Sequence, residues 1–219
     1  GDVYKRQGMI SEVDTQIGRI MKTLKEKGEL DNTIIVFASD NGLAVGRHGL
    51  LGKQNLYEHS VCVPMAMVIP GMEKGTRKDV DCYLYDIYPT LCDLLNIKPA
   101  ESVTGKSLAP VLKGAEKHRD QLFLAYNSFQ RALVKDGWKY IIYNVDGAIT
   151  EQLFNLQTDP DEMVNLASDA KYDFKKQAYK RILKEEMKKN NDFCNLDLHY
   201  WMGRPGKMSW DEASKLYVY

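Results

Sequence analysis

The sequence lacks an excess of charge of either sign, because 30 lysine and arginine residues balance 30 aspartate and glutamate residues over 219 positions. A surface that binds nucleic acid or another polyanion through bulk charge is therefore excluded. The sequence also lacks any apolar run of roughly 18 residues, which a membrane-spanning helix requires. We expect neither nucleic acid nor a membrane span among the interactions of this chain.

Cysteine is scarce and carries no metal-binding pattern. None of the cysteines forms the Cys-x-x-Cys spacing of a zinc or redox site; they are Cys62, Cys82, Cys92 and Cys194. We expect separate, mostly buried thiols, with a Cys82–Cys92 bridge left open as an alternative. The sequence also shows no signal peptide, internal repeat or low-complexity tract.

The first residues, 1–7, are interpreted as a sequencing or cloning scar, because residues 2–7 match the translation of a transposon end used to prepare sequencing libraries. The alternative is an ordinary polar N-terminus. On the first interpretation the chain is a fragment whose true sequence resumes near Gly8, and the missing signal peptide then says nothing about localisation.

The chain is organised around residues 39–53, which follow the uninterrupted apolar run of residues 34–38. A short, β-branched apolar run predicts a strand buried on both faces, as is typical of a parallel sheet. Ligands of open α/β sheets bind beyond the carboxyl ends of such strands, and Asp40 and Asn41 stand at that position. Both side chains offer the hard oxygen ligands that Ca²⁺ and Mg²⁺ prefer.

The rest of this loop carries groups that suit an anionic ester. Its glycines allow sharp turns and close approach of the backbone to a ligand, while His48 supplies an imidazole and Lys53 an ammonium. Each group alone has a simpler interpretation: Asp-Asn-Gly as a hairpin turn, His48 as structural, and Lys53 as a solvated charge. Residues 43–51 do not alternate as a returning strand would, so the combined pattern favours a ligand-binding loop.

Several motifs in this region also carry a family resemblance: Ser39-Asp40-Asn41-Gly42, Gly46-Arg47-His48-Gly49-Leu50, Gly52-Lys53, Leu56-Tyr57-Glu58 and Val63-Pro64. Together they resemble the C-terminal half of the sulfatase family, in the alkaline-phosphatase superfamily, and the resemblance extends from residue 8 to about residue 167. It implies that Asp40 and Asn41 bind Ca²⁺ (or Mg²⁺). It also implies that Lys53 contacts the sulfate and that His48 contacts the sulfate or protonates the leaving oxygen. Cys62 departs from the family pattern, which usually has a basic residue there.

The resemblance implies an α/β enzyme that hydrolyses a sulfated small molecule or sulfated glycan to an alcohol and sulfate. The family's nucleophile is a formylglycine, which a formylglycine-generating or sulfatase-maturating enzyme makes from a Cys/Ser-x-Pro-x-Arg motif, and this motif is absent here. We therefore expect a fragment that is inactive as given, from a periplasmic or secreted parent. The alternatives are a phosphodiesterase or phosphonate hydrolase of the same superfamily, or a non-catalytic binding or structural relative.

The resemblance divides the chain into the C-terminal part of the catalytic domain, residues 8–115, and a small C-terminal subdomain and tail, residues 116–219. The first part should contain a partial alkaline-phosphatase-like sheet with helices. It begins with an amphipathic helix over residues 8–27, whose apolar stripe is predicted to be core: Ile10, Val13, Ile17, Ile20, Met21 and Leu24. Because few strand partners are present, we expect an open face or edge near residues 33–38 and a solvent-facing metal loop.

The second part is predicted to be a small antiparallel sheet followed by a helix. Short strands are expected at residues 122–126, 130–134, 139–143 and 152–154, with Asp136-Gly137 as a two-residue hairpin turn. A charged helix should follow over residues 171–189, with an apolar set of Phe174, Ala178, Ile182, Leu183 and Met187. Trp201 and Trp210 either line a sugar subsite or pack on the surface, and packing is the simpler interpretation. The small sheet should be the better-formed part, because its contacts are local.

Overall fold

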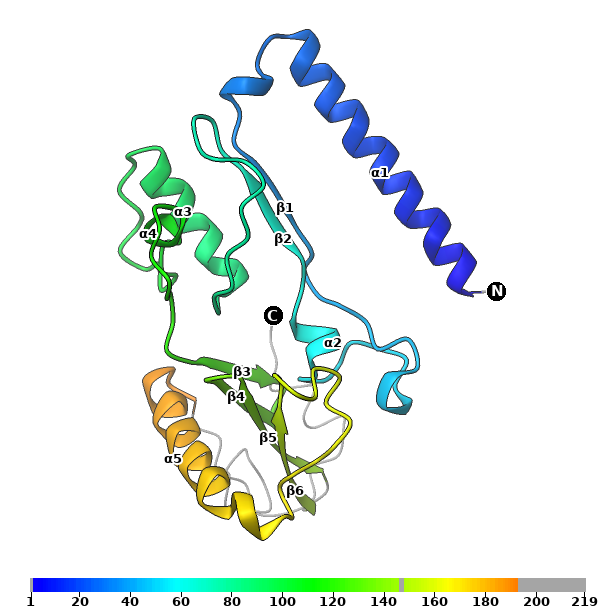
Figure 1. The fold of residues 1–219 in the computed structure, drawn as a ribbon, viewed down its shortest axis with the longest axis vertical. Coiled ribbons are helices and arrows are strands. Elements are labelled where there is room, and N and C mark those ends of the chain that lie inside the picture. Colours follow the sequence, from blue (N-terminus) through cyan, green and yellow to red (C-terminus); the bar gives the residue numbers. More distant parts are fainter. Residues whose placement is uncertain (1, 146–147, 193–219) are drawn as a thin grey trace, which may run out of the picture. The chain divides into compact units, whose positions relative to one another are not determined.

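The structure is a computed structural model that describes residues 2–145 and 148–192, and it is a mixed α/β fold with two antiparallel sheets (Figure 1). The chain divides into two compact units, residues 1–39 with 64–77 and residues 40–63 with 78–219. No helix in the described ranges combines the length and apolar character needed to cross a membrane. The division near residue 115 stays a prediction, and Cys194, Trp201 and Trp210 lie outside the described residues.

The first unit contains helix α1 (Asp2–Glu26), the 3₁₀ turn η1 (Leu30–Asn32) and the strand pair β1 (Ile35–Ala38) and β2 (Met65–Val68). The two strands run antiparallel, with Ile35 opposite Val68 and Ala38 opposite Met65. The predicted parallel, doubly buried strand is therefore wrong for this structure, and the side chain of Phe37 is about half exposed. In the described residues β1 has a single neighbour, so it keeps the open edge and open face that the sequence predicts.

The apolar stripe of α1 is not core: half of its residues are exposed, and Ile17, Met21 and Leu24 are only partly buried. The side chains of Ile10, Val13 and Ile20 are each more than half exposed. The 3.6-residue period correctly predicts a helix, but a helical face is buried only when another layer lies over it. The described residues of this unit supply no such layer, so the prediction of a core stripe is wrong here.

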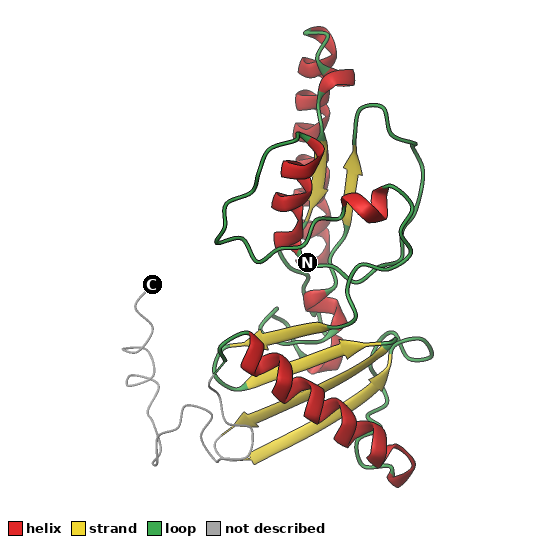
Figure 2. Ribbon diagram, turned by 90° about the vertical axis from the view of Figure 1, so that its left-hand side faces the viewer, coloured by secondary structure: helices red, strands yellow, loops and turns green. Residues whose placement is uncertain are grey.

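The second unit is built on a four-stranded antiparallel sheet in the order β3-β4-β5-β6 (Figure 2). Its strands are β3 (Leu122–Tyr126), β4 (Gln130–Lys135), β5 (Trp138–Val145) and β6 (Ala148–Asn155). Asp136 and Gly137 join β4 to β5 with φ values of 48° and 74°, which a type I′ hairpin turn requires. All four predicted strands and the predicted hairpin are therefore confirmed.

Helix α5 (Asp173–Lys189) covers one face of this sheet (Figure 2). It follows the turn η4 (Ala170–Tyr172) and buries Tyr179, Leu183 and Met187 against Leu133, Tyr140, Ile142 and Leu153. The helix is confirmed, but Phe174 of the predicted apolar set is almost fully exposed. Tyr179 takes its place, because residues 179, 183 and 187 follow the four-residue spacing of one helical face.

The opposite face of the sheet is covered by the segment that follows the predicted ligand-binding loop. Leu56 packs with Ala132, Ile141 and Phe154, just before the short helix α2 (Glu58–Val61). The central strands β4 and β5 are thus covered on both faces. The packing of Leu56 fixes one end of the loop to a rigid support.

The turn η3 (Leu84–Asp86) and the helices α3 (Ile87–Leu94) and α4 (Ala109–Leu112) complete the unit and gather around a buried carboxylate. Asp86 is fully buried and accepts hydrogen bonds from the Arg119 guanidinium, His118, and the backbone N–H groups of Tyr83 and Lys106.

The described cysteines are all free thiols, so the Cys82–Cys92 bridge is not formed. Of these three described cysteines, Cys92 is buried, Cys82 is partly buried and Cys62 is exposed, so the expectation of mostly buried thiols is met within this set by Cys92.

Candidate active-site loop

The loop that follows β1 turns where its backbone meets the backbone of α2. The N–H of Gly42 donates to the carbonyl of Ser60 at 2.9 Å. A Cβ atom on Gly42 would lie only 2.0 Å from the carbonyl oxygen of His59, so a side chain cannot be placed there without moving the backbone. Glycine is therefore required at residue 42 by close approach, which the sequence suggested for the loop in general.

The middle of the loop holds a strained backbone. Val45 and His48 have φ values of 50° and 52°, and Gly46 between them has a φ of 98°. A β-branched residue such as Val45 rarely adopts positive φ. Strain of this kind persists where the surrounding structure holds it, and it is concentrated at functional sites. The 3₁₀ turn η2 (Arg47–Gly49) therefore presents His48 from a defined position.

Three of the predicted site residues lie together at the start and end of this loop. The Lys53 ammonium donates to Oδ1 of Asn41 at 2.6 Å, and the N–H of Asn41 donates to Oδ1 of Asp40 at 2.8 Å. Asp40 and Lys53 are exposed and Asn41 is partly buried. The loop thus brings a carboxylate, an amide oxygen and an ammonium close together at a largely solvent-facing position.

This group of residues fits a hard divalent cation as a partial ligand set. Asn41 Oδ1 already faces a cationic group, and the neighbouring Asp40 carboxylate adds negative charge. Calcium takes about six to eight oxygen ligands, so these two side chains can supply only part of the shell. Among the described residues, no group of three or more His, Cys, Asp or Glu side chains could hold a metal ion.

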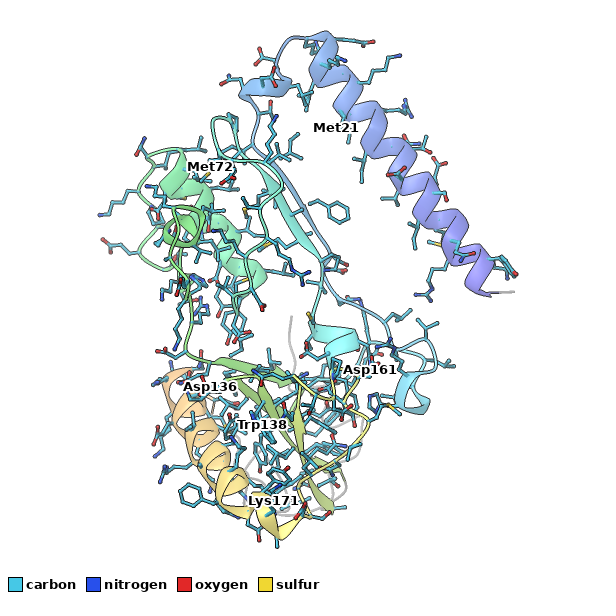
Figure 3. The ribbon with its side chains drawn as sticks, viewed as in Figure 1. Met21, Met72, Asp136, Trp138, Asp161 and Lys171 are labelled. Atoms are coloured by element: carbon cyan, nitrogen blue, oxygen red, sulfur yellow. The ribbon has the colours of Figure 1, made fainter. Side chains whose placement is uncertain are left out.

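His48 lies against the turn that follows β6 instead of facing Lys53. Its Nε2 is 3.0 Å from the carbonyl oxygen of Asp161, and its ring stacks on Tyr57 with centroids 4.0 Å apart. A carbonyl only accepts, so Nε2 must carry a proton and donate. Nδ1 is then the nitrogen available to a ligand. Figure 3 shows Asp161 on the turn after β6, next to this part of the loop.

Two further contacts hold the loop to the sheet. Arg47 forms an ion pair with the Asp161 carboxylate at 2.5 Å, and the Tyr57 hydroxyl bonds with the amide of Gln152 at 2.8–3.0 Å. Burial raises the pKa of Tyr57, so the phenol stays neutral and can donate. Partial burial lowers the pKa of His59, and the nearby charges of His48, Arg47 and Lys139 lower it further.

The sequence did not identify the buried ion cluster beneath the loop. Lys139 on β5 is fully buried, and its Nζ lies 2.6 Å from Glu58 and 2.8 Å from Glu162. Burial raises the pKa of Glu162, while the Lys139 ammonium opposes that shift. The one available signal was a lysine at the start of a mostly apolar and aromatic strand, on the same face as Ile141. A lysine in such a strand indicates a buried ion cluster only when both faces of the strand are known to be covered.

The loop thus follows a strand end, carries a carboxylate, an amide and a lysine close together, and is packed on an antiparallel sheet. The family described as "N-sulphoglucosamine sulphohydrolase, C-terminal" matches residues 46–191, which is more than half of the chain. The chain therefore belongs to the sulfatase family.

Relatives of known sequence agree with this assignment. Arylsulfatase K of Gallus gallus is 34% identical over 174 residues, which cover 73% of this chain and 32% of the relative. Arylsulfatase K of Homo sapiens is 31% identical over 172 residues. A sulfatase of Formosa agariphila is 33% identical over 175 residues, covering 80% of this chain and 34% of the relative. The chain thus spans about a third of the length of these curated relatives.

Solved structures share the fold. A protein solved in complex with its substrate D-glucosamine-2-N,6-O-disulfate is 28% identical, with a TM-score of 0.77 over 84% of this chain and 40% of that one. The phosphonate monoester hydrolase of Agrobacterium radiobacter is 31% identical, with a TM-score of 0.73 over 83% of this chain and 40% of that one. The superfamily resemblance and the α/β fold class are therefore confirmed.

Proposed function

We propose that this chain supplies the metal- and sulfate-contacting loop of an enzyme that hydrolyses an organic sulfate ester to an alcohol and inorganic sulfate. The observation that carries the proposal is the 2.6 Å contact between the Lys53 ammonium and Asn41 Oδ1, next to Asp40. That contact supports the proposal, because a group suited to an anion and groups suited to a cation then act close together. Membership of the sulfatase family supports the same chemistry.

Lys53 is proposed to hold the sulfate. Its ammonium is a compact charge on a long flexible stem, so it can leave Asn41 and pair with a sulfate oxygen when a substrate binds. An ammonium ~4 Å from an anionic oxygen, at an effective dielectric of about 20, contributes on the order of 4 kcal/mol of Coulomb energy. The contribution grows as negative charge accumulates in the transition state.

His48 is proposed to act at the leaving oxygen or at the sulfate. Its Nε2 proton is engaged by the Asp161 carbonyl, which fixes the ring and leaves Nδ1 as the reacting nitrogen. When Nδ1 is protonated it can donate that proton to the oxygen that leaves sulfur, so the alcohol departs neutral. If it does not donate a proton, Nδ1 serves instead as a contact to the sulfate.

Asp40 and Asn41 are proposed as ligands of Ca²⁺ (or Mg²⁺), completed by residues that are not among those described. Such an ion, when bound, neutralises the sulfate oxygens and orients the ester. The nucleophile, a formylglycine in the family, is likewise expected from sequence outside this chain, and a maturation enzyme would install it. We propose a sulfated sugar or other sulfated small molecule as substrate, as one structural relative was solved with a disulfated glucosamine. A periplasmic or secreted location is part of the same proposal.

The second candidate is hydrolysis of a phosphonate or phosphate ester, and the similarity to the phosphonate monoester hydrolase favours it. Both esters present anionic oxygens that Lys53 and a divalent ion can bind. The loop itself therefore does not separate the two chemistries.

The decisive experiment is hydrolysis by the full-length protein of matched aryl sulfate and aryl phosphonate esters, with the released anion quantified. Sulfate release that is lost with a chelator and restored by Ca²⁺ or Mg²⁺ supports the proposal. Release of phosphonate alone would support the second candidate instead. His48→Ala should slow esters of poor leaving groups more than activated ones if His48 is a proton donor. Equal slowing of both would leave it as a sulfate contact.

A further inference from the structure

We propose that Lys139 is a positioning residue for the active-site loop, and that it acts on His48 through the turn of residues 159–162. This inference rests on the proposed function, because it takes His48 to be part of the ester-binding site. Lys139 lies on the central strand β5, and its side chain is fully buried on the sheet face that carries the loop.

The Lys139 ammonium joins three separate parts of the second unit. Its Nζ lies 2.6 Å from Oε1 of Glu58 at the start of α2 and 2.8 Å from Oε1 of Glu162 on the turn. It also donates to the backbone carbonyl of Leu56 at 2.9 Å. The carbonyl oxygen of Leu56 accepts a hydrogen bond from the ammonium, while the two carboxylate oxygens lie within ion-pair distance of it. The sheet, the end of the loop and the turn are therefore fixed relative to one another at a single buried atom.

Glu162 also contacts the chain segment that follows the loop. Its second oxygen, Oε2, accepts the backbone N–H of Glu58 at 2.6 Å. The backbone of Glu162 has a φ of 57°, which a non-glycine residue keeps only where its surroundings hold it. The contacts with Lys139 and Glu58 hold it on the side of the sheet, and its own N–H donates to the Asp159 carbonyl within the turn. Any displacement of Glu162 must therefore move the preceding residue, Asp161.

Asp161 is the residue that fixes His48. Its carbonyl oxygen is 3.0 Å from His48 Nε2, and its carboxylate pairs with Arg47 at 2.5 Å. The path from Lys139 to the imidazole thus runs through Glu162 and one peptide unit. Loss of the ammonium should shift the Asp161 carbonyl and release the His48 ring.

A simpler role for Lys139 would be that of a stabilising core ion pair. Burying an ammonium and carboxylates carries a desolvation penalty that an apolar side chain of similar size avoids. Unlike a methionine, a lysine at this position attracts three oxygen atoms. Two belong to Leu56 and Glu58, just after the loop, and one belongs to Glu162 on the turn. The two roles differ in what happens to His48, so they can be separated by experiment.

The test compares Lys139→Met with Lys176→Met in the full-length protein. Lys176 is a matched control, because it pairs with Asp173 at 3.0 Å and donates to the Ala167 carbonyl at 2.6 Å, but on α5 across the sheet. Each variant is assayed for kcat and KM on an aryl sulfate well below its melting temperature. We expect Lys139→Met to lower kcat severalfold with little change in KM, and Lys176→Met to change neither. Equal kcat values for both variants would overturn the proposal.

A double-mutant cycle with His48→Ala asks whether Lys139 acts through His48. We expect Lys139→Met to have almost no further effect on kcat once the imidazole is removed. Fully additive losses would contradict the proposed path and leave Lys139 as a stabilising residue.

A chemical-modification experiment tests this inference without measuring enzyme activity. It can therefore distinguish a wrong inference about Lys139 from a wrong proposed function. Diethyl pyrocarbonate modifies imidazole nitrogens, and mass spectrometry can follow its reaction at His48. Lys139→Met should speed that reaction severalfold relative to Lys176→Met, because a ring released from the Asp161 carbonyl can also lose its Nε2 proton and react at Nε2, in addition to Nδ1. An unchanged rate would overturn the inference even if the protein is a sulfatase. If Lys139→Met does not fold, Glu162→Gln removes one charge of the cluster and keeps an amide oxygen for the Glu58 N–H, and the same readouts apply.

Discussion

The imidazole of His48 lies flat on the phenol ring of Tyr57, with centroids 4.0 Å apart and an interplanar angle of 2°. Tyr57 is in turn held by Gln152 on β6 and packs edge-on against Phe154, with centroids 6.1 Å apart. The orientation of the proposed catalytic imidazole therefore depends on an aromatic side chain that is itself held by the small sheet.

Tyr57→Leu should weaken catalysis in the full-length protein, while Tyr57→Phe should not. A stacked aromatic pair contributes about 0.5–1.5 kcal/mol. If the transition state loses this stabilisation, the rate should fall roughly two- to twelvefold. Phenylalanine keeps the stack and loses only the bond to Gln152. Measured kcat values on one aryl sulfate check this, and equal loss in both variants would show that the hydroxyl, not the stack, matters.

Lys53→Ala should nearly abolish turnover in the full-length protein. The Coulomb contribution of about 4 kcal/mol estimated for the ammonium corresponds to roughly a thousandfold in rate. Lys98→Ala, at an exposed lysine of the same unit, is the control and should leave kcat/KM unchanged. A loss below about tenfold for Lys53→Ala would place Lys53 outside the sulfate site.

Gly42→Ala should disrupt the loop because the new methyl group would meet the His59 carbonyl at 2.0 Å. We expect a lower melting temperature and reduced metal-dependent activity, since Asp40 and Asn41 directly precede this contact. Gly18→Ala is the matched control: residue 18 lies in α1 with open space around it, and alanine is a better helix former than glycine. Unchanged melting and activity in Gly42→Ala would show that the loop can move aside at no cost.

Asp86 should make the second unit sensitive to acid. Burial alone would raise the pKa of Asp86, but hydrogen bonds from Arg119, from the N–H groups of Tyr83 and Lys106, and from His118 lower it below the usual 3.8. A carboxyl with a depressed folded-state pKa stabilises the fold above its unfolded pKa. That contribution is then lost as the pH falls through the lower folded value.

Unfolding free energies measured across this range check the prediction for Asp86. Below pH 3.8 the original protein should lose stability more steeply than Asp86→Asn, which has no carboxyl to titrate. Asp93→Asn, at an exposed carboxylate, should follow the original protein. Parallel curves for all three would show that Asp86 does not contribute to the pH dependence.

Much of the local structure was determined by the sequence itself. Short strand-like segments and the Asp136-Gly137 pair predicted the four strands and the hairpin, because both signals act between neighbours in the chain. Residue type and spacing also predicted Asp40, Asn41 and Lys53 as site residues, and their roles stay a prediction. The structure then brought the side chains of Asn41 and Lys53 together.

Other features were decided only by tertiary structure. The antiparallel pairing of β1 with β2 and the exposed residues of the α1 stripe depend on which other layers surround these elements. The hydrophobic period of a segment does not indicate which layers those are. The same holds for the supports of the loop: His48 meets Asp161 across 113 positions of sequence, and the N–H of Glu58 meets Glu162 across 104. Contacts this distant arise from how the sheet and its covering segments pack, so local patterns cannot specify them.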